Sequence, residues 1–235
     1  SGTIRSRVKP RSEFWSKSGM TGPILVINPN SNPAVTEGLD TAMMPFRMGG
    51  LPPIECLTVS AGPFGIESQA DSDAAVAPML ALIHARTDAS AVIIACYSDP
   101  GIDAAREATN TPVFGMQESG FLTAMARGDR IGVVAISEGS ILRHRKYLRR
   151  MGVLDRMVAE RSLNISVAQT ASGTGTFDRL EEISHTLVQH DHADVIVLGC
   201  AGLSAHRSRL ESIMQRPVVD PTQAAVAMAL GAVLV

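Results

Sequence analysis

The chain has 235 residues, of which 45% are hydrophobic and 19% are charged, and its formal net charge is −2. This composition is typical of a folded protein with a substantial core, and the length permits one large domain or two small ones. Nucleic-acid-binding proteins usually concentrate positive charge and use aromatic side chains for stacking, so the near-neutral charge and the aromatic content of 4% argue against that class.

The two ends of the chain differ from the rest in composition. Residues 1–19 are rich in Ser, Arg and Lys and contain no apolar run of the kind found in a secretory signal peptide. We expect a disordered tail or an added extension there, with Met20 as the natural start. The apolar stretch from Ala224 to Val235 is too short to cross a bilayer, so it predicts a buried helix and no membrane association.

From Ile24 onward, short β-rich runs alternate with longer helical segments. The expected strands are 24–28, 54–59, 91–95, 112–115, 131–136, 165–168, 195–198 and 217–219. The expected helices are 33–44, 67–85, 101–108, 119–126, 139–151, 177–190, 205–214 and 222–234. Several strands are continuous apolar runs, which is typical of parallel strands buried on both faces, so the pattern predicts an α/β fold.

This order of elements repeats once along the chain. The strand at 91–95 leads to Cys96 and, after a helix, to a Pro-Val pair; the strand at 195–198 leads to Cys200 and, after a helix, to another Pro-Val pair. Repetition of the whole unit favours duplication over chance. The two cysteines are therefore expected at equivalent places, just beyond the carboxyl end of a strand.

The repeat predicts two pseudo-symmetric, flavodoxin-like α/β domains built on parallel sheets. The first half, residues 20–119, carries Cys96, and the second half, residues 120–235, carries Cys200. The C-terminal helix is free to return to the first half. Ligands of open α/β sheets bind beyond the carboxyl ends of the strands, so both cysteines are expected to face one cleft between the halves.

The cysteines also limit the chemistry and the compartment. There are three, with no CxxC pair and no spacing typical of a zinc site, so we expect no disulfide scaffold, no metal and a cytoplasmic location. Cys56 lies within a predicted strand and is expected to be a small core residue. Cys96 and Cys200 instead precede helices, whose N-terminal dipoles favour the thiolate form.

Two thiols at matched positions suit proton transfer at carbon. Removing a proton from a carbon next to a carbonyl needs a base close by and donors that stabilise the enolate. Racemisation also needs a second group that returns the proton to the opposite face. One thiolate and one thiol can exchange these roles, so the hypothesis requires no metal and no organic cofactor.

Four motifs in this order resemble a known family. They are ILVINPNS at 24–31, GPFGIE at 62–67, CYSDPG at 96–101 and GCAG at 199–202. Together they resemble the aspartate/glutamate/hydantoin racemase superfamily, and most of all its hydantoin and allantoin racemases, over nearly all of residues 20–235. The resemblance implies a homo-oligomeric, cofactor-free enzyme with Cys96 and Cys200 as its acid/base pair and a small-molecule substrate, a 5-substituted hydantoin or allantoin.

The resemblance also implies a set of substrate-binding residues, each with a simpler alternative role. The set is Asn28, Ile66, Tyr97, Ser98, Ser137, Ala201 and Gly202. Asn28 reaches a substrate carbonyl or caps the helix expected at 33, and Ser98 is a donor beside Cys96 or a helix cap. Tyr97, Ala201 and Gly202 match backbone donors, and Ile66 shapes the side-chain pocket.

The chain departs from the hydantoin branch at one point. That branch often has a pair of threonines at the end of the fifth strand, where this chain has Ala135 and Ile136, which leaves Ser137 to supply a hydroxyl. Glu118 is a substrate contact or simply a carboxylate at a helix start.

Other functions stay open. They are an Asp/Glu-type amino-acid racemase, an enzyme like maleate isomerase or arylmalonate decarboxylase, and a non-catalytic small-ligand-binding protein. The Cys-Asn-Thr and Gly-Cys-Thr-His signatures of glutamate racemases are absent, which favours a neutral cyclic ureide. A basic run at 143–150 predicts a solvated helix face or a subunit contact, and His206 is a weaker catalytic candidate.

Overall fold

The computed structural model describes residues 22–172 and 175–234, so the expectations for residues 1–19 lie outside the described part. Two four-stranded parallel sheets have the orders β2-β1-β3-β4 and β6-β5-β7-β8. The first contains β1 (Ile24–Asn28), β2 (Ile54–Thr58), β3 (Ala91–Ile94) and β4 (Val113–Gly115). The second contains β5 (Ile131–Ala135), β6 (Met157–Ser162), β7 (Val195–Leu198) and β8 (Val218–Val219). The two orders are the same pattern repeated, and the predicted two-sheet α/β fold is confirmed.

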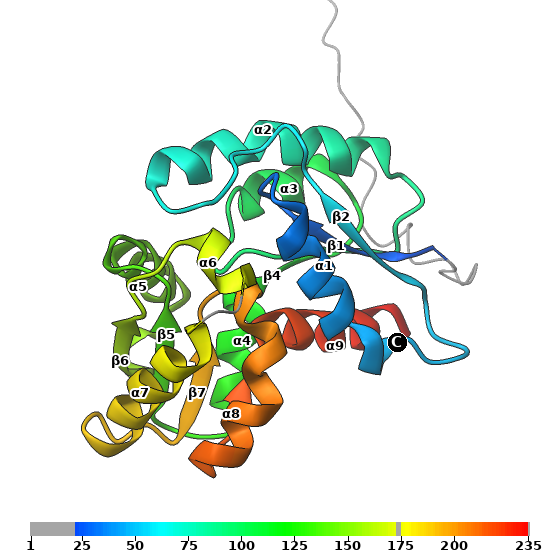
Figure 1. Cartoon of the computed structure of the whole chain (residues 1–235). Coiled ribbons are helices and arrows are strands. Elements are labelled where there is room, and N and C mark those ends of the chain that lie inside the picture. The colour runs from blue at the N-terminus through cyan, green and yellow to red at the C-terminus, as the bar shows by residue number, and fades with distance from the viewer. Residues whose placement is uncertain (1–21, 173–174, 235) are drawn as a thin grey trace, which may run out of the picture.

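Helices surround both sheets (Figure 1). In the first half they are α1 (Pro33–Ala42), α2 (Gln69–Ala85), α3 (Ile102–Ala108) and α4 (Met116–Met125), with a short 3-10 turn, η2 (Met44–Phe46). In the second half they are α5 (Glu138–Met151), α6 (Val167–Ser172), α7 (Thr176–Gln189), α8 (Arg207–Met214) and α9 (Pro221–Leu234), with the 3-10 turns η3 (Leu154–Arg156) and η4 (Ala201–His206). The helix α4 leads from the first sheet to the second.

The C-terminal helix α9 ties the two halves together. It packs along α4 and against β3 and β4 of the first sheet, and in Figure 1 it lies between the two lobes. Ala225, Val226 and Ala229 on α9 are fully buried, as the apolar sequence predicted. None of the described helices is both long and apolar enough to cross a membrane.

The inner strands are apolar on both faces because helices cover both. Leu25 and Ile27 of β1 pack with residues of α2 and α3, whereas Ile24 and Val26 face a core that continues into the second half. The strands therefore read as unbroken hydrophobic runs instead of alternating ones.

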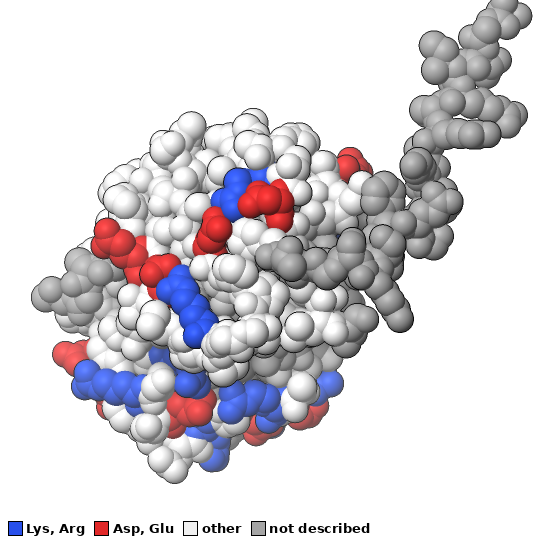
Figure 2. Space-filling model, turned by 90° about the vertical axis from the view of Figure 1, so that its right-hand side faces the viewer, with Lys and Arg blue, Asp and Glu red and all other residues white. Residues whose placement is uncertain are grey.

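On the face drawn in Figure 2, charged side chains are scattered over the upper lobe, and both signs gather together at the lower end.

One predicted strand was wrong. A strand was expected at 165–168, but this segment leads into α6, and the sixth strand is Met157–Ser162. This strand lies at the edge of its sheet, where it can carry two charged residues. Glu160 pairs with His144 of α5, and Arg161 pairs with Asp191. These charges interrupt the apolar run that identified the other strands.

Candidate active site

A narrow cavity lies where the carboxyl ends of the inner strands of the two sheets meet. Its lining residues are Asn30, Val35, Ile66, Ala95, Cys96, Tyr97, Ser98, Ile136, Ser140, His144, Val167, Gly199, Cys200 and Ala201. They come from both halves, and both cysteines expected to face one cleft are among them. Within the described ranges, no group of three or more His, Cys, Asp and Glu side chains is placed to hold a metal ion.

Cys96 follows β3 in a tight turn. The Asp99 N–H donates to the Cys96 carbonyl oxygen at 2.9 Å, which closes the turn. Burial raises the pKa of the Cys96 thiol to about 12, while the backbone N–H of Ser98 and the guanidinium of Arg143 favour the thiolate and oppose that rise.

Cys200 follows β7 in the same way and is 9% exposed. Burial raises its pKa, and the backbone N–H of Gly202 and the hydroxyl of Thr170 partly offset this. The Thr170 Oγ1 lies 3.9 Å from the Cys200 Sγ. Gly199 has no room for a side chain, because a Cβ there would come within 2.6 Å of the Val134 carbonyl oxygen. The chain can therefore pass close to β5 just before the thiol.

The two thiols affect each other's ionisation. Both thiols line one cavity, and a charge on Cys200 raises the pKa of Cys96, because two thiolates in the same cavity would repel. Each thiolate is supported by a backbone N–H two residues further on, from Ser98 or Gly202. The electrostatics favour one thiolate and one thiol over two thiolates.

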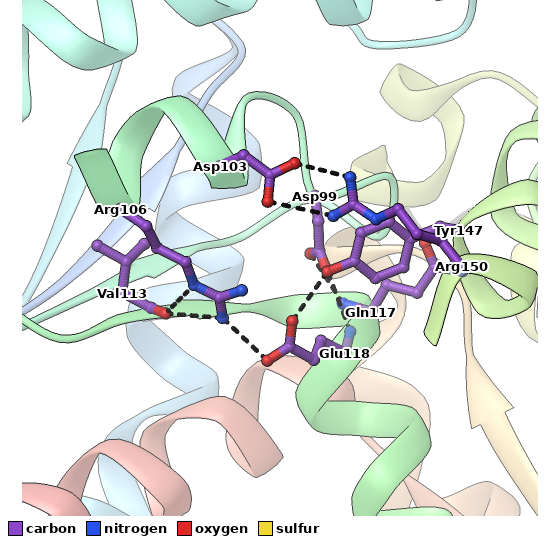
Figure 3. A network of polar contacts seen from close by, with 8 residues as sticks. All are labelled: Asp99, Asp103, Arg106, Val113, Gln117, Glu118, Tyr147 and Arg150. Carbon is purple, nitrogen blue, oxygen red and sulfur yellow. Dashed lines mark hydrogen bonds and ion pairs between the residues drawn. The ribbon is translucent and has the colours of Figure 1, made fainter. Parts of the chain in front are cut away.

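The loop behind Cys96 is fixed by a polar network (Figure 3). Asp99 is 3% exposed, and its two carboxyl oxygens accept the N–H groups of Gln117 and Glu118 at 2.9 and 3.0 Å, at the start of α4. Burial raises the pKa of Asp99 to about 8. Glu118 pairs with Arg106 at 2.9 Å and accepts from the Tyr147 hydroxyl at 2.8 Å. Glu118 thus lies in the first turn of α4 and does not line the cavity.

Four of the seven predicted substrate-binding residues line the cavity: Ile66, Tyr97, Ser98 and Ala201. Ser98 is not a helix cap, because α3 begins at Ile102 and Gly101 precedes it. Gly202 lies on a neighbouring pocket together with His206, although its N–H supports Cys200.

Asn28 lies behind the cavity wall. Its amide nitrogen donates to Asn30 Oδ1, the Asn32 carbonyl oxygen and Thr36 Oγ1, and its oxygen accepts from the Asn30 N–H. The side chain therefore holds the loop that places Asn30 on the wall. The expected capping role belongs to Asn32, whose Oδ1 accepts the Ala34 N–H at 3.1 Å.

Ser137 precedes α5, and its hydroxyl is buried without a hydrogen-bond partner in the described part of the chain. It is not among the residues that line the cavity, whereas Ser140, one turn along α5, is. The Ser140 hydroxyl donates to the Ser137 carbonyl oxygen at 2.7 Å.

The basic run at 143–150 was expected to form a solvated helix face. This prediction is confirmed for Lys146, Arg149 and Arg150 and is wrong for His144. These three are exposed and line a groove of about 650 Å³ beside Ser98, whereas His144 is 2% exposed and lines the cavity. A signal was available in the sequence, because Ser140, His144 and Leu148 recur every four residues and form the buried face of α5. The basic neighbours of His144 hid it.

Glu67 is a second residue that the sequence did not single out. Its carbonyl oxygen accepts from the Arg143 guanidinium at 3.2 Å, and its Oε1 accepts the Val167 N–H at 3.0 Å. The first-half motif at 62–67 is thereby joined to α5 and to the start of α6, both in the second half. Glu67 thus links the halves next to Ile66 and Val167, which line the cavity.

Comparison with known proteins finds matches over most of the chain. The family described as Asp/Glu/Hydantoin racemase matches residues 24–229. A hydantoin racemase of Paenarthrobacter aurescens is 32% identical over 215 residues, 88% of this chain and 89% of the relative. A hydantoin racemase of Pseudomonas sp. (strain NS671) is 32% identical over 216 residues, 88% of this chain and 84% of the relative. The solved allantoin racemase from Klebsiella pneumoniae has a TM-score of 0.87 at 29% identity and covers 91% of this chain and 88% of its own.

Proposed function

The chain belongs to the Asp/Glu/hydantoin racemase family, and we propose that it is a cofactor-independent racemase in which Cys96 and Cys200 move a proton on a carbon next to a carbonyl. The hydantoin racemases and the allantoin racemase that it resembles are isomerases, and so is this enzyme. The observation that carries the proposal is that two thiols from equivalent strand ends line one cavity.

In the proposed reaction, one cysteine is a thiolate and the other a thiol. The thiolate takes the proton from one face of the substrate, and the C–H electron pair forms an enolate whose charge lies on the carbonyl oxygen. The opposite thiol then returns a proton to the other face. Each turnover exchanges the protonation states of the two cysteines, so the reverse reaction starts from the state that the forward one leaves.

The proposed substrate is a 5-substituted hydantoin or allantoin. The relatives named for hydantoin and the structural neighbour named for allantoin support this choice. The described residues that line the cavity include Val35, Ile66, Ile136 and Val167 but no Lys or Arg. Such a wall suits a neutral ring better than an amino acid with a free carboxylate, which would need a cation. A cytoplasmic location and assembly into a homo-oligomer stay predictions.

The test is a panel of single-enantiomer hydantoins and allantoin, followed by chiral chromatography. We expect the wild type to racemise at least one of them, in the presence of chelators and carbonyl reagents, and Cys96→Ser and Cys200→Ser each to lose racemisation in both directions. Cys56→Ser is the matched control and should retain activity. Near-normal racemisation by either active-site serine variant would refute the two-thiol assignment.

Each single variant retains one thiol and should therefore work on one face only. In deuterated water we expect Cys96→Ser and Cys200→Ser to exchange the α-proton of opposite enantiomers with retention of configuration. This one-face exchange measures each thiol separately.

A further inference from the structure

A buried histidine, His144, lines the cavity near Cys96 and pairs with a buried glutamate behind it, Glu160, and the two-thiol reaction makes no use of either. His144 is 2% exposed, and the Glu160 side chain is fully buried. The His144 Nδ1 lies 2.5 Å from Glu160 Oε1, and the other oxygen of Glu160 has no partner in the described part of the chain. A buried carboxylate with one partner is costly to maintain, which calls for an explanation beyond packing.

The other side of the imidazole faces Ser98. The His144 Nε2 lies 3.4 Å from Ser98 Oγ, a long hydrogen bond of the kind often found in active sites without substrate. The ring also meets the Tyr97 ring edge to face, with centroids 4.9 Å apart. Glu160, His144 and Ser98 therefore form a carboxylate–imidazole–hydroxyl series that ends in the cavity.

The position of His144 is fixed from several sides. Its carbonyl oxygen accepts from the Gln117 side chain at 3.0 Å, and it occupies the inner face of α5 between Ser140 and Leu148. An imidazole whose Nδ1–H donates to a carboxylate has one defined orientation, and the negative charge of the carboxylate stabilises the imidazolium form, in which Nε2 also carries a hydrogen. Such preorganisation gives its Nε2 a fixed partner, the hydroxyl of Ser98.

We propose that His144 and Glu160 are positioning residues that hold the Ser98 hydroxyl toward the carbonyl oxygen of the substrate, so that Ser98 stabilises the enolate. This inference rests on the proposed racemase function and adds to it the group that stabilises the developing charge. Ser98 is suited to that contact because it lines both the cavity and the wider groove beside it.

The chemical step remains a simple proton transfer. A thiolate takes the α-proton, the C–H electron pair becomes a carbon–carbon double bond, and the carbonyl π electrons move to oxygen. The Ser98 O–H donates a hydrogen bond to that oxygen, while the Ser98 oxygen accepts the Nε2–H of His144, whose Nδ1–H donates to the Glu160 carboxylate. No bond of Ser98 or His144 breaks, and the opposite thiol returns a proton to carbon.

Two substitutions of His144 separate this role from a structural one. In His144→Gln the side-chain amide reaches the place of Nε2 and can still contact Ser98, whereas in His144→Asn it reaches the place of Nδ1 and can still contact Glu160. We expect His144→Asn to lower kcat by about tenfold to a hundredfold with little change in KM, and His144→Gln to lose about threefold or less. If His144 only satisfies Glu160, the order of the two variants is reversed, and the proposal fails.

One-face exchange provides a second, independent readout. The same enolate forms from both enantiomers, so its stabilisation affects both faces. We expect His144→Asn to slow exchange by the same factor in the Cys96→Ser and Cys200→Ser backgrounds. Slowing of the Cys96 face alone would mean that His144 merely supports the turn that carries Cys96, which would overturn the proposal, as would no slowing on either face.

Controls distinguish failure of this proposal from failure of the proposed function. His84→Asn, at an exposed position of α2, should leave all rates unchanged. Thermal unfolding checks that each variant is folded, and Glu160→Gln, which retains an acceptor for Nδ1 but not the charge, should lose less activity than His144→Asn. If the wild type racemises no ureide, the proposed function fails; if it racemises one and His144→Asn equals wild type, only this inference fails.

Discussion

The loops that follow Cys96 and Cys200 occupy equivalent places in the two halves, and their backbones support the thiols alike. Their side-chain surroundings differ. Cys96 has Arg143 nearby, whose positive charge favours the thiolate, whereas Cys200 has Glu67 nearby, whose negative charge opposes it. The repeated backbone thus provides the two bases, while a side chain from the opposite half makes the surroundings of each thiol different.

The supports beneath the two loops also differ in origin. In the first half, Asp99 of the Cys96 loop accepts N–H groups at the start of α4. In the second half, Asp220 lies at the start of α9 itself and accepts the N–H groups of Thr222 and Gln223. Each half thus has a buried carboxyl group at the start of the corresponding helix, but only in the first half does it belong to the cysteine loop.

The largest expected effect is the pH dependence of proton exchange, because the pKa of both thiols is raised. Burial keeps each thiol mostly protonated near neutral pH, and raising the pH increases the thiolate fraction about tenfold per unit below the pKa. We expect one-face exchange by either single-thiol variant to rise about a hundredfold from pH 7 to 9. Alkylation of the remaining active-site thiol by iodoacetamide, read by mass spectrometry, should rise in parallel. A flat profile for either thiol would show that burial does not keep that thiol protonated near neutral pH.

The second effect concerns stability and is confined to the Cys96 side. Asp99→Ala removes the carboxyl that accepts two N–H groups at the start of α4, so we expect the free energy of unfolding to fall by about 1–2 kcal/mol. Asp103→Ala, an exposed partner of Arg150, is the control and should change it little. Urea unfolding monitored by circular dichroism measures both.

This second effect has a pH dependence with a defined sign. The folded state retains the Asp99 proton up to about pH 8, whereas an unfolded chain loses it near its ordinary pKa of 3.8. Between these values the folded state binds more protons, so this group lowers the free energy of unfolding as pH rises. Asp99→Ala should therefore destabilise more at pH 5 than at pH 8, and an equal effect at both would contradict the buried carboxyl as its cause.

Much of this arrangement could be predicted from the sequence because it is carried by apolar runs. The strand at 24–28 is hydrophobic up to its last residue, Asn28, the strand at 195–198 is hydrophobic throughout, and the structure has both with the expected bounds. The position of Cys96 and Cys200 after equivalent strands follows from the same runs. A short, continuous apolar run indicates a strand that is buried on both faces, and such a run can be recognised without knowing which residues it contacts.

What could not be predicted depends on pairing between distant residues. Glu160 and His144 look like solvated charges in the sequence, and only their contact across α5 and β6 makes burial possible. The charges of Glu160 and Arg161 explain why the sixth strand was misplaced. Asn28 matched a family position, but its four hydrogen bonds to the following loop and to Thr36 of α1 depend on a backbone turn that spacing alone does not define.

The third effect isolates the positive charge beside Cys96. Arg143→Gln removes a cation that favours the thiolate, so the pKa of Cys96 should rise further and exchange on the Cys96 face at pH 8 should fall by about threefold to tenfold. Exchange on the Cys200 face should change much less. Arg149→Gln, on the exposed side of the same helix, is the matched control. Equal slowing of both faces would show that Arg143 acts by linking the two halves through Glu67 and not through its charge on Cys96.

The smallest expected effect is a faster exchange, in place of a slower one, and it concerns the face served by Cys200. The Glu67 carboxylate raises the pKa of Cys200, and its Oε1 also accepts the Val167 N–H. Glu67→Gln retains an oxygen that can accept this N–H but removes the charge, so the pKa of Cys200 should fall and more thiolate should form at a given pH. We expect exchange and iodoacetamide alkylation at Cys200 in the Cys96→Ser background to become about twofold to threefold faster at pH 8. Glu67→Ala separates the charge from this link between the halves, because it removes the charge and the hydrogen bond together. If Glu67→Gln slows the Cys200 face as Glu67→Ala does, then the carboxylate serves to hold the two halves together, and the inequality between the two thiols has another source.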